Sequence, residues 1–213
     1  MSLIAGRCVD VEHPLVQHKL GMLRDRETST HLFRELVNEL TLLLTYEATK
    51  DMATEEVEVE TPLERTTVHR ISGKKVAVCP ILRAGLGMLD GVLSLMSGAR
   101  VGFIGLYRNE ETLEPVEYYV KLPADVAARD VILLDPMLAT GNSTAAAVKT
   151  VKDAGAQSVR VIALIAAPEG IERVTGEHPD VAIVVAGLDR ELNQNGYILP
   201  GLGDAGDRLF GTK

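Results

Sequence analysis

The chain has 213 residues, of which 46% are hydrophobic and only 4% aromatic, and its formal net charge is −8. This length fits a single domain, residues 1–213, with an ordinary hydrophobic core, and the apolar fraction argues against disorder. The acidic balance argues against a nucleic-acid partner, because nucleic-acid binders present a basic face. It does not exclude a phosphate ligand, since the N-terminus of a helix supplies local positive potential.

The cysteines and the first residues bear on the compartment in which the protein works. Cys8 and Cys79 suit a reducing compartment better than a disulfide framework. The first residues lack the basic and apolar regions of a signal peptide, and no apolar run approaches the roughly 20 residues that span a bilayer. We therefore expect a soluble cytoplasmic protein that has no membrane partner.

The N-terminal part of the chain contains two predicted helices, followed by an exposed extended segment. Residues 30–49 place apolar side chains at three-and-four spacing, which predicts an amphipathic helix, and a shorter helix is expected after Pro14. The N-terminal helical segment thus covers about residues 1–50. Residues 54–70 alternate polar and apolar side chains, which indicates an exposed edge strand or hairpin.

Short apolar runs at wide intervals predict the strands of the remaining chain. These runs cover residues 76–79, 101–107, 131–134, 159–166 and 181–186. Helical patterns between several of them cover residues 87–96, 144–154 and 169–174. The alternation predicts an α/β fold with a mainly parallel twisted sheet flanked by helices. Ligands bind such sheets outside the carboxyl ends of the strands, which are followed here by the loops 80–86, 108–117 and 135–144.

The C-terminal residues 193–213 combine many glycines with large apolar side chains. The glycine content argues against a helix, and the apolar side chains argue against a frayed terminus. Glycine-rich backbone suits close wrapping around a flat ligand. We therefore expect about residues 190–213 to form a hood over such a ligand.

Three sequence patterns that are typical of other kinds of binding site are not supported by the residues around them. Residues 201–206 match the dinucleotide pattern G-x-G-x-x-G, but that fingerprint needs a following helix within a whole βαβ unit. Gly196 and Gly201 have the spacing of a Walker A loop, but Leu202 stands where its Lys must be. His13 and His18 are five residues apart with no carboxylate at ligand spacing, and the other histidines are isolated from one another, so we expect no dedicated metal site.

The most informative segment is residues 135–144, Asp-Pro-Met-Leu-Ala-Thr-Gly-Asn-Ser-Thr, between an apolar run and a helical pattern. Gly141 permits close approach to the backbone, and hydroxyls including those of Ser143 and Thr144 stand beside the amides that begin the helix. Such amides bind a phosphate without Lys or Arg. Asp135 would repel a bare phosphate unless it faces a ribose diol, a Mg²⁺ ion or a developing cation. We therefore favour a sugar-phosphate site over an ordinary connection whose hydroxyls only cap the helix.

This segment resembles the motif with which type I phosphoribosyltransferases bind 5-phosphoribosyl 1-pyrophosphate (PRPP). Asp-Pro-Met-Leu-Ala-Thr-Gly resembles the form of the uracil phosphoribosyltransferase family in particular. Further segments resemble that family in order, namely residues 13–20, 23–25, 80–85, 107–112, 167–170 and 196–213. Pro136 replaces the second acid of many type I members, and Asn142 replaces a usual Gly. Because Asn tolerates left-handed backbone well, the loop is expected to keep its shape.

The resemblance implies a set of site residues. Arg83, after a strand end, offers paired guanidinium donors to the pyrophosphate, and Arg108 contacts PRPP from a mobile flap. The implied catalytic residues are Asp135, Arg83, Arg108 and Asp204. The implied PRPP-binding residues are Arg83, Arg108, Asp135, Pro136, Met137, Leu138, Ala139, Thr140, Gly141, Asn142, Ser143 and Asp204. Uracil is expected against the backbone of Ile198, Gly203, Asp204 and Ala205.

The resemblance also implies the reaction and its requirements. Uracil and PRPP give UMP and pyrophosphate, a step of pyrimidine salvage, with Mg²⁺ bound mainly through PRPP and water. The family further implies a homo-oligomer, either a dimer or a tetramer, and a possible GTP effector.

Two alternatives remain open. A regulatory protein of the same fold could bind a nucleotide and control RNA or a protein partner, although the charge of −8 argues against an RNA-binding face. Another enzyme of this fold could use a purine or orotate, although residues 196–213 resemble the uracil family specifically.

Overall fold

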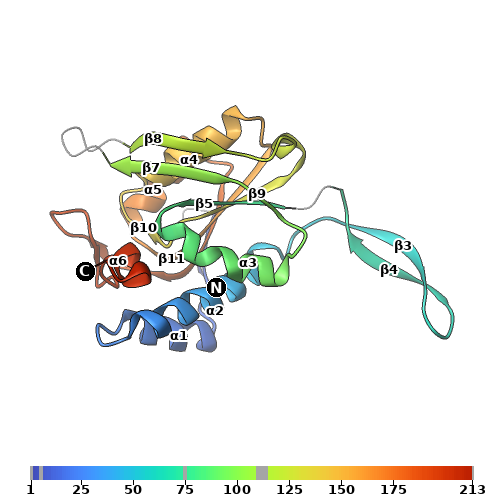
Figure 1. Ribbon diagram of the computed structural model, residues 1–213, viewed down its shortest axis with the longest axis horizontal. Coiled ribbons are helices and arrows are strands. Elements are labelled where there is room, and N and C mark those ends of the chain that lie inside the picture. The colour runs from blue at the N-terminus through green and yellow to red at the C-terminus, as the bar shows by residue number, and fades with distance from the viewer. Residues whose placement is uncertain (1, 5–6, 74–75, 109–114, 213) are drawn as a thin grey trace.

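A mainly parallel sheet forms the centre of the molecule (Figure 1). The computed structural model describes residues 2–4, 7–73, 76–108 and 115–212. From one edge to the other the strands are β1 (Ser2–Ile4), β2 (Cys8–Asp10), β12 (Ala182–Leu188), β11 (Ser158–Ala166), β9 (Asp130–Leu134), β5 (Ala77–Leu82), β7 (Phe103–Arg108) and β8 (Pro115–Lys121). All neighbours from β2 to β7 are parallel, and only the edge strands β1 and β8 pair antiparallel. The predicted α/β fold is confirmed.

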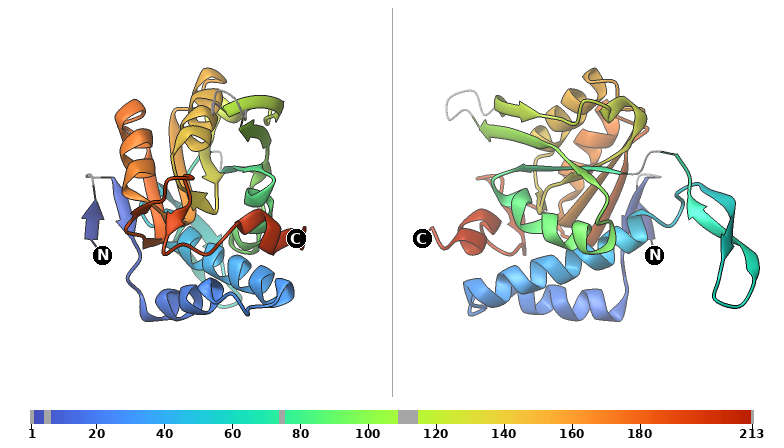
Figure 2. Two further views of the ribbon diagram at one scale, coloured as in Figure 1. Left: turned by 90° about the vertical axis from the view of Figure 1, so that its left-hand side faces the viewer. Right: turned by 45° about the vertical axis from the view of Figure 1, so that its right-hand side comes forward.

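Helices cover both faces of this sheet. One face carries α1 (Pro14–Arg24), α2 (Thr30–Ala48) and α3 (Leu89–Leu95), and the other carries α4 (Asn142–Asp153) and α5 (Pro168–Glu177) (Figures 1 and 2). Alternate residues of β9 point to opposite faces, so that Ile132 and Leu134 join the first apolar layer while Val131 and Leu133 join the second. Burial on both faces explains the continuous apolar runs of the sequence.

The two N-terminal helices begin at capping residues. The Nδ1 atom of His13 accepts a hydrogen bond from the N–H of Leu15, and Pro14 is the first residue of α1. The hydroxyl of Ser29 accepts from the N–H of Leu32 at the start of α2. Both predicted helices are confirmed, but the helical segment begins at Pro14 rather than at about residue 1. Residues 8–10 form β2 instead, because they pair with the edge of β12.

Strand β5 is longer than its apolar run predicts. It continues beyond residues 76–79 to Leu82, because Ile81 and Leu82 pair with β7 while Pro80 pairs with Leu134 of β9. The following loop therefore begins at Arg83 rather than at Pro80, and the 3₁₀ helix η1 (Ala84–Met88) leads directly into α3. The short strand β6 (Arg100–Val101) also pairs with β5.

A hairpin made of β3 (Thr54–Glu60) and β4 (Arg65–Ile71) projects from the body of the molecule (Figures 1 and 2). The two strands pair with each other and with no other strand of the described chain. Leu63, in the turn between them, is 94% exposed. The hairpin predicted over residues 54–70 is confirmed, and it forms an arm rather than part of the sheet.

The C-terminal residues contain the short helix α6 (Ala205–Phe210), so the expectation that glycine excludes a helix is wrong. The Asp204 carboxylate accepts from the N–H of Asp207 at the start of α6, and Gly211 ends it in a left-handed conformation. The glycines at 201, 203 and 211 lie outside the helical turns. Before them, β13 (Glu191–Leu192) and β14 (Ile198–Leu199) form a separate antiparallel pair.

Candidate active site

A cavity of about 270 Å³ lies at the carboxyl ends of β5 and β9. It is lined by Ile81, Leu82, Arg83, Ala84, Leu106, Asp135, Met137, Ala139, Thr140, Gly141, Ser143, Thr144 and Gly196. The structure therefore brings most of the predicted PRPP-binding residues to one cavity, at the edge of the sheet where α/β proteins bind ligands. Pro136, Leu138 and Asn142 belong to the same segment but do not line the cavity.

Residues 135–144, called the phosphate loop below, are anchored to the sheet before they reach α4. Met137 and Leu138 form the short strand β10 (Met137–Leu138), which pairs with the end of β11. Gly141 has φ of 78° and precedes α4, and no side chain caps this helix. The first N–H groups of a helix have no acceptor within it, so they remain available to an anion. The left-handed residue is Gly141, while Asn142 is already helical and replaces the usual Gly without strain.

The first turn of α5 packs against the phosphate loop backbone to backbone. A β-carbon at Gly141 would lie 2.6 Å from the carbonyl oxygen of Gly170. A β-carbon at Gly170 would lie 2.4 Å from the carbonyl oxygen of Ala139 and 2.6 Å from that of Leu138. Side chains at either position would push the loop and the helix apart. Sequence reasoning did not assign Gly170 to the site, although it lies in a segment, residues 167–170, that resembles the family.

Asp135 is oriented by its own loop. Its Oδ2 atom accepts a hydrogen bond of 2.8 Å from the hydroxyl of Thr144, and its Oδ1 atom accepts one of 3.3 Å from the N–H of Met137. Burial raises the pKa of Asp135, and these two hydrogen bonds act in the opposite direction. The hydroxyl of Thr144 therefore donates to Asp135, a contact that the sequence pattern did not reveal.

The two predicted arginines lie at the ends of neighbouring strands. Arg83 is exposed at the end of β5 and lines the cavity. Arg108 is the last residue of β7, with its backbone paired to Pro115 across the antiparallel ladder. Its side chain and residues 109–114, which include most of the predicted flap, lie outside the described part of the structure. The contact of Arg108 with PRPP therefore stays a prediction.

The predicted uracil-binding residues lie beside a second cavity, of about 460 Å³, which shares no lining residue with the first. Gly203 and Asp204 line it, whereas Ile198 and Ala205 are buried next to them. We call residues 201–205 the base loop. It adjoins the first cavity through α6, because a β-carbon at Gly206 would lie 3.8 Å from that of Ala84.

The Asp204 carboxylate has a structural role in addition to the predicted one. Its Oδ1 atom accepts a hydrogen bond of 2.9 Å from the N–H of Asp207 and so caps α6. Asp204 does not line the cavity that contains the phosphate loop. Its placement between PRPP and uracil stays a prediction.

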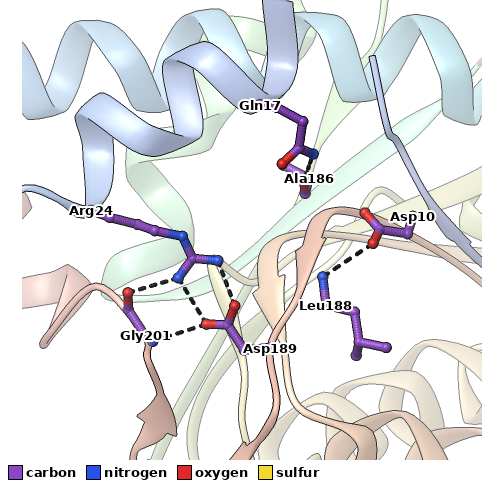
Figure 3. Close-up of polar contacts among 7 residues, drawn as sticks. All are labelled: Asp10, Gln17, Arg24, Ala186, Leu188, Asp189 and Gly201. Atoms are coloured by element: carbon purple, nitrogen blue, oxygen red, sulfur yellow. Dashed lines mark hydrogen bonds and ion pairs between the residues drawn. The ribbon is translucent and has the colours of Figure 1, made fainter. Parts of the chain in front are cut away.

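An ion pair between a half-buried arginine and a buried aspartate, which sequence reasoning missed, supports the base loop. Figure 3 shows Arg24 and Asp189 in contact with each other and with both backbone polar groups of Gly201. Arg24 lies in residues 23–25, which resemble the family. The resemblance therefore drew attention to Arg24 but did not indicate that Asp189 is its partner.

The described residues contain no group of three His, Cys, Asp or Glu side chains that could hold a metal ion. Among the described residues that line the first cavity, Asp135 carries the one carboxylate. Such a donor set fits an ion held largely by a polyphosphate and water, as Mg²⁺ often is. No helix in the described part of the chain is long and apolar enough to cross a membrane.

Known structures identify the class of fold first. A hypoxanthine-guanine phosphoribosyltransferase from Bacillus anthracis superposes with a TM-score of 0.51 at 11% identity, covering 75% of this chain and 80% of that one. At this identity the likeness concerns the fold alone. A solved protein from Aquifex aeolicus superposes with a TM-score of 0.92 at 41% identity, covering 97% of this chain and 99% of that one. The fold is that of the type I phosphoribosyltransferases.

Sequence comparison then identifies the family. The family model described as "Uracil phosphoribosyltransferase" matches residues 10–212. A uracil phosphoribosyltransferase from Clostridium botulinum (strain Eklund 17B / Type B) is 58% identical over 208 residues, which cover 98% of this chain and 100% of that protein. The chain belongs to the uracil phosphoribosyltransferase family, and it is a pentosyl-transferring enzyme.

Proposed function

We propose that this enzyme transfers the phosphoribosyl group of PRPP to uracil and releases UMP and pyrophosphate, as a step of pyrimidine salvage. The observation that best supports this proposal is the cavity in which the phosphate loop, Asp135 and Arg83 meet, with the base loop adjoining it. The names of relatives such as the Clostridium botulinum protein support uracil as the base.

The reaction exchanges one bond at the anomeric carbon of the ribose for another. The bond from that carbon to a pyrophosphate oxygen breaks, a bond to uracil N1 forms, and the N1 proton is lost. Positive charge develops on the ribose, while negative charge develops on the pyrophosphate. Residues that stabilise both charges, without a covalent nucleophile, are sufficient for catalysis of this kind.

Each part of the site has a proposed task in this exchange. The free N–H groups at the start of α4 hold the 5′-phosphate, so that remote binding energy positions the reacting carbon. Asp135 orients the ribose hydroxyls and stabilises the positive charge, and its burial strengthens that interaction. Arg83 and Arg108 bind the pyrophosphate. Mg²⁺ would be held mainly by PRPP and water, with Asp135 as the carboxylate that the described cavity lining offers, and it would further neutralise the pyrophosphate charge.

Uracil is proposed to bind through backbone groups of Ile198 and residues 203–205. Fixed N–H and C=O groups match one edge of uracil, and they leave the amino group of cytosine opposite the wrong partner. Such polar groups reject an analogue strongly once the base covers them, because groups left unpaired away from water are costly.

The experiment is a transfer assay with labelled base, PRPP and Mg²⁺. Uracil, cytosine, hypoxanthine and orotate are tested in parallel, and pyrophosphate is measured in the same samples. We expect UMP and pyrophosphate in equal amounts from uracil alone, and loss of both when EDTA removes the metal. Transfer to another base would retain the PRPP site and overturn the assignment of uracil. Tight PRPP or UMP binding without any transfer would favour a regulatory protein.

We further propose that the enzyme is a homo-oligomer and that GTP is an effector. Support for the first comes from the β3–β4 arm, which pairs with no other strand in the described residues and carries Leu63 in its exposed turn. The second rests on family resemblance, and the transfer assay at increasing GTP concentrations tests it.

A further inference from the structure

We propose that Arg24 and Asp189 are positioning residues for base recognition, because they fix Gly201 and thereby the base loop that follows it. This inference rests on the proposed function. Neither side chain belongs to the predicted PRPP or uracil set. Arg24 lines the second cavity, and Asp189 lines neither of the two cavities described above.

The contacts make a closed ring of charge-assisted hydrogen bonds (Figure 3). The two terminal nitrogens of Arg24 donate to the two carboxylate oxygens of Asp189, at 2.8 Å and 2.5 Å. One of these nitrogens also donates to the carbonyl oxygen of Gly201 at 2.7 Å. The N–H of Gly201 donates to Asp189 at 2.9 Å. Both backbone polar groups of Gly201 are therefore held by one ion pair.

The burial of Asp189 and the space left for Arg24 show that the fold accommodates this ion pair specifically. The side chain of Asp189 is 4% exposed and that of Arg24 is 24% exposed. Arg24 reaches Asp189 past Gly187, where a β-carbon would lie 3.3 Å from the Arg24 guanidinium and 2.7 Å from Leu20. Glycine at this position of β12 thus leaves room for the end of α1 and for its last basic side chain.

The position of Gly201 affects the residues that precede and follow it. It has φ of 69°, and a β-carbon there would lie 2.2 Å from the carbonyl oxygen of Ile198. Ile198 precedes it and Gly203 follows it, and both belong to the predicted uracil set. A shift of Gly201 must therefore move the groups that read the base.

A second arginine holds the neighbouring residue. Arg208 of α6 donates to the carbonyl oxygen of Leu202 at 2.9 Å and to that of Leu23 at 2.8 Å. Its guanidinium lies 4.4 Å from the centroid of the Phe33 ring. The C-terminal end of α1 and the base loop are therefore joined at two successive residues.

Asp189 also links the base loop to the phosphate loop through the sheet. Its N–H donates to the carbonyl oxygen of Ala166 at 2.8 Å, and the N–H of Ala167 donates to the carbonyl oxygen of Leu138 at 3.0 Å. Its side chain holds Gly201, as described. One residue at the end of β12 thus fixes the separation of the two loops, and hence the approach of uracil to the anomeric carbon.

The test separates uracil recognition from PRPP binding. In Arg24→Lys an ammonium replaces the planar fork, and it cannot serve both oxygens of Asp189 and the carbonyl of Gly201 together. We expect KM for uracil to rise about tenfold, as expected for loss of one hydrogen bond to a charged group. KM for PRPP and the PRPP-induced rise in Tm should stay near wild type. Discrimination of uracil against cytosine should fall, and Asp189→Asn should show the same split.

Arg129→Lys is the matched control. Arg129 and Asp125 form another ion pair with two hydrogen bonds, at 2.9 Å and 3.0 Å, and neither residue lines the cavities of the site. This variant should keep both KM values. Equal rises of KM for uracil and for PRPP in Arg24→Lys, or a fall of Tm alone, would overturn the proposal.

Two further readouts keep the test independent of folding and of the proposed reaction. Hydrogen exchange on the wild-type chain should show a protected Gly201 amide, because Asp189 accepts its hydrogen bond. Rapid exchange there would overturn the proposal even if both variants failed to fold. A wild-type enzyme that makes no UMP from uracil would contradict the proposed function, whereas wild-type activity with unchanged variant kinetics would contradict only this inference.

Discussion

The carboxylate of Asp135 is held in a fixed orientation and is buried away from water. The Thr144 hydroxyl and the Met137 N–H fix its two oxygens, while burial raises its pKa. A carboxylate held in this way needs little reorganisation when positive charge develops beside it, and the low local dielectric strengthens the attraction. We therefore expect Asp135 to act on the transition state more than on the binding of uracil.

Asp135→Asn tests this expectation. The substitution removes the negative charge and keeps the size of the side chain, so we expect kcat to fall about a hundredfold or more. KM for uracil should change little. Steady-state kinetics with both substrates provide the measurement. Asp130→Asn is the control, since Asp130 begins the same strand at its opposite end. An unchanged turnover in Asp135→Asn would remove Asp135 from the mechanism.

Contiguous residues of the site could be predicted, and distant partners could not. Asp135 and Gly141 lie in one short motif after an apolar strand, so their positions at the end of the sheet follow from the sequence alone. The ion pair of Arg24 with Asp189 joins residues 165 positions apart. Its existence depends on how α1 packs on β12, which no local pattern encodes.

Helix α5 and the phosphate loop form a unit at the scale of secondary structure. The loop is short, and its shape depends on the carbonyl oxygens of Leu138 and Ala139, against which the first turn of α5 packs. The position of α5 therefore controls the direction of the N–H groups at the start of α4, although α5 itself does not line the cavity.

Two glycines of α5 allow a matched comparison. Gly170→Ala places a methyl group 2.4 Å from the carbonyl oxygen of Ala139, so we expect a higher KM for PRPP and a loss of about 1–3 kcal/mol of stability. Gly176→Ala faces open space in the same helix, and it should stabilise the protein by about 0.5–1 kcal/mol. Chemical denaturation and PRPP titration measure both effects. Equal behaviour of the two variants would contradict the role of α5.

Elements with strong periodicity were predictable, and elements decided by ends or by pairing were not. The apolar runs gave β9 and β11 within a residue or so, because both strands are buried on both faces. Helix α6 was missed because capping by Asp204 and Gly211 outweighs the composition around it. The extension of β5 through Pro80 depends on pairing with β7, a neighbour that the sequence does not specify.

At the scale of the whole molecule, the β3–β4 arm stands apart from the compact body (Figure 2). An isolated two-stranded hairpin is at best marginally stable in water. The arm nevertheless forms a regular ladder from Thr54 to Ile71. Contact with a second copy of the chain would give it the packing that its own body does not provide.

Replacement of residues 55–70 by a short Gly-Ser turn tests the arm. We expect the wild-type chain to sediment as a dimer or larger species, and the shortened chain to sediment as a smaller one. The body should stay folded, because the arm belongs to neither hydrophobic core layer. Analytical ultracentrifugation at several concentrations gives the masses. A shortened chain with the wild-type number of subunits would show that the assembly forms elsewhere. Leu63→Ser offers a milder form of the same test.

The order of these segments along the chain has a consequence for biosynthesis. The ribosome completes β5, β9 and the phosphate loop before Asp189 and the base loop, because they come earlier in the chain. Arg24 is synthesised early, whereas Asp189, its ion-pair partner, is synthesised late. On a nascent polypeptide, the predicted PRPP-binding segment 135–144 is therefore present before the residues that are predicted to select the base.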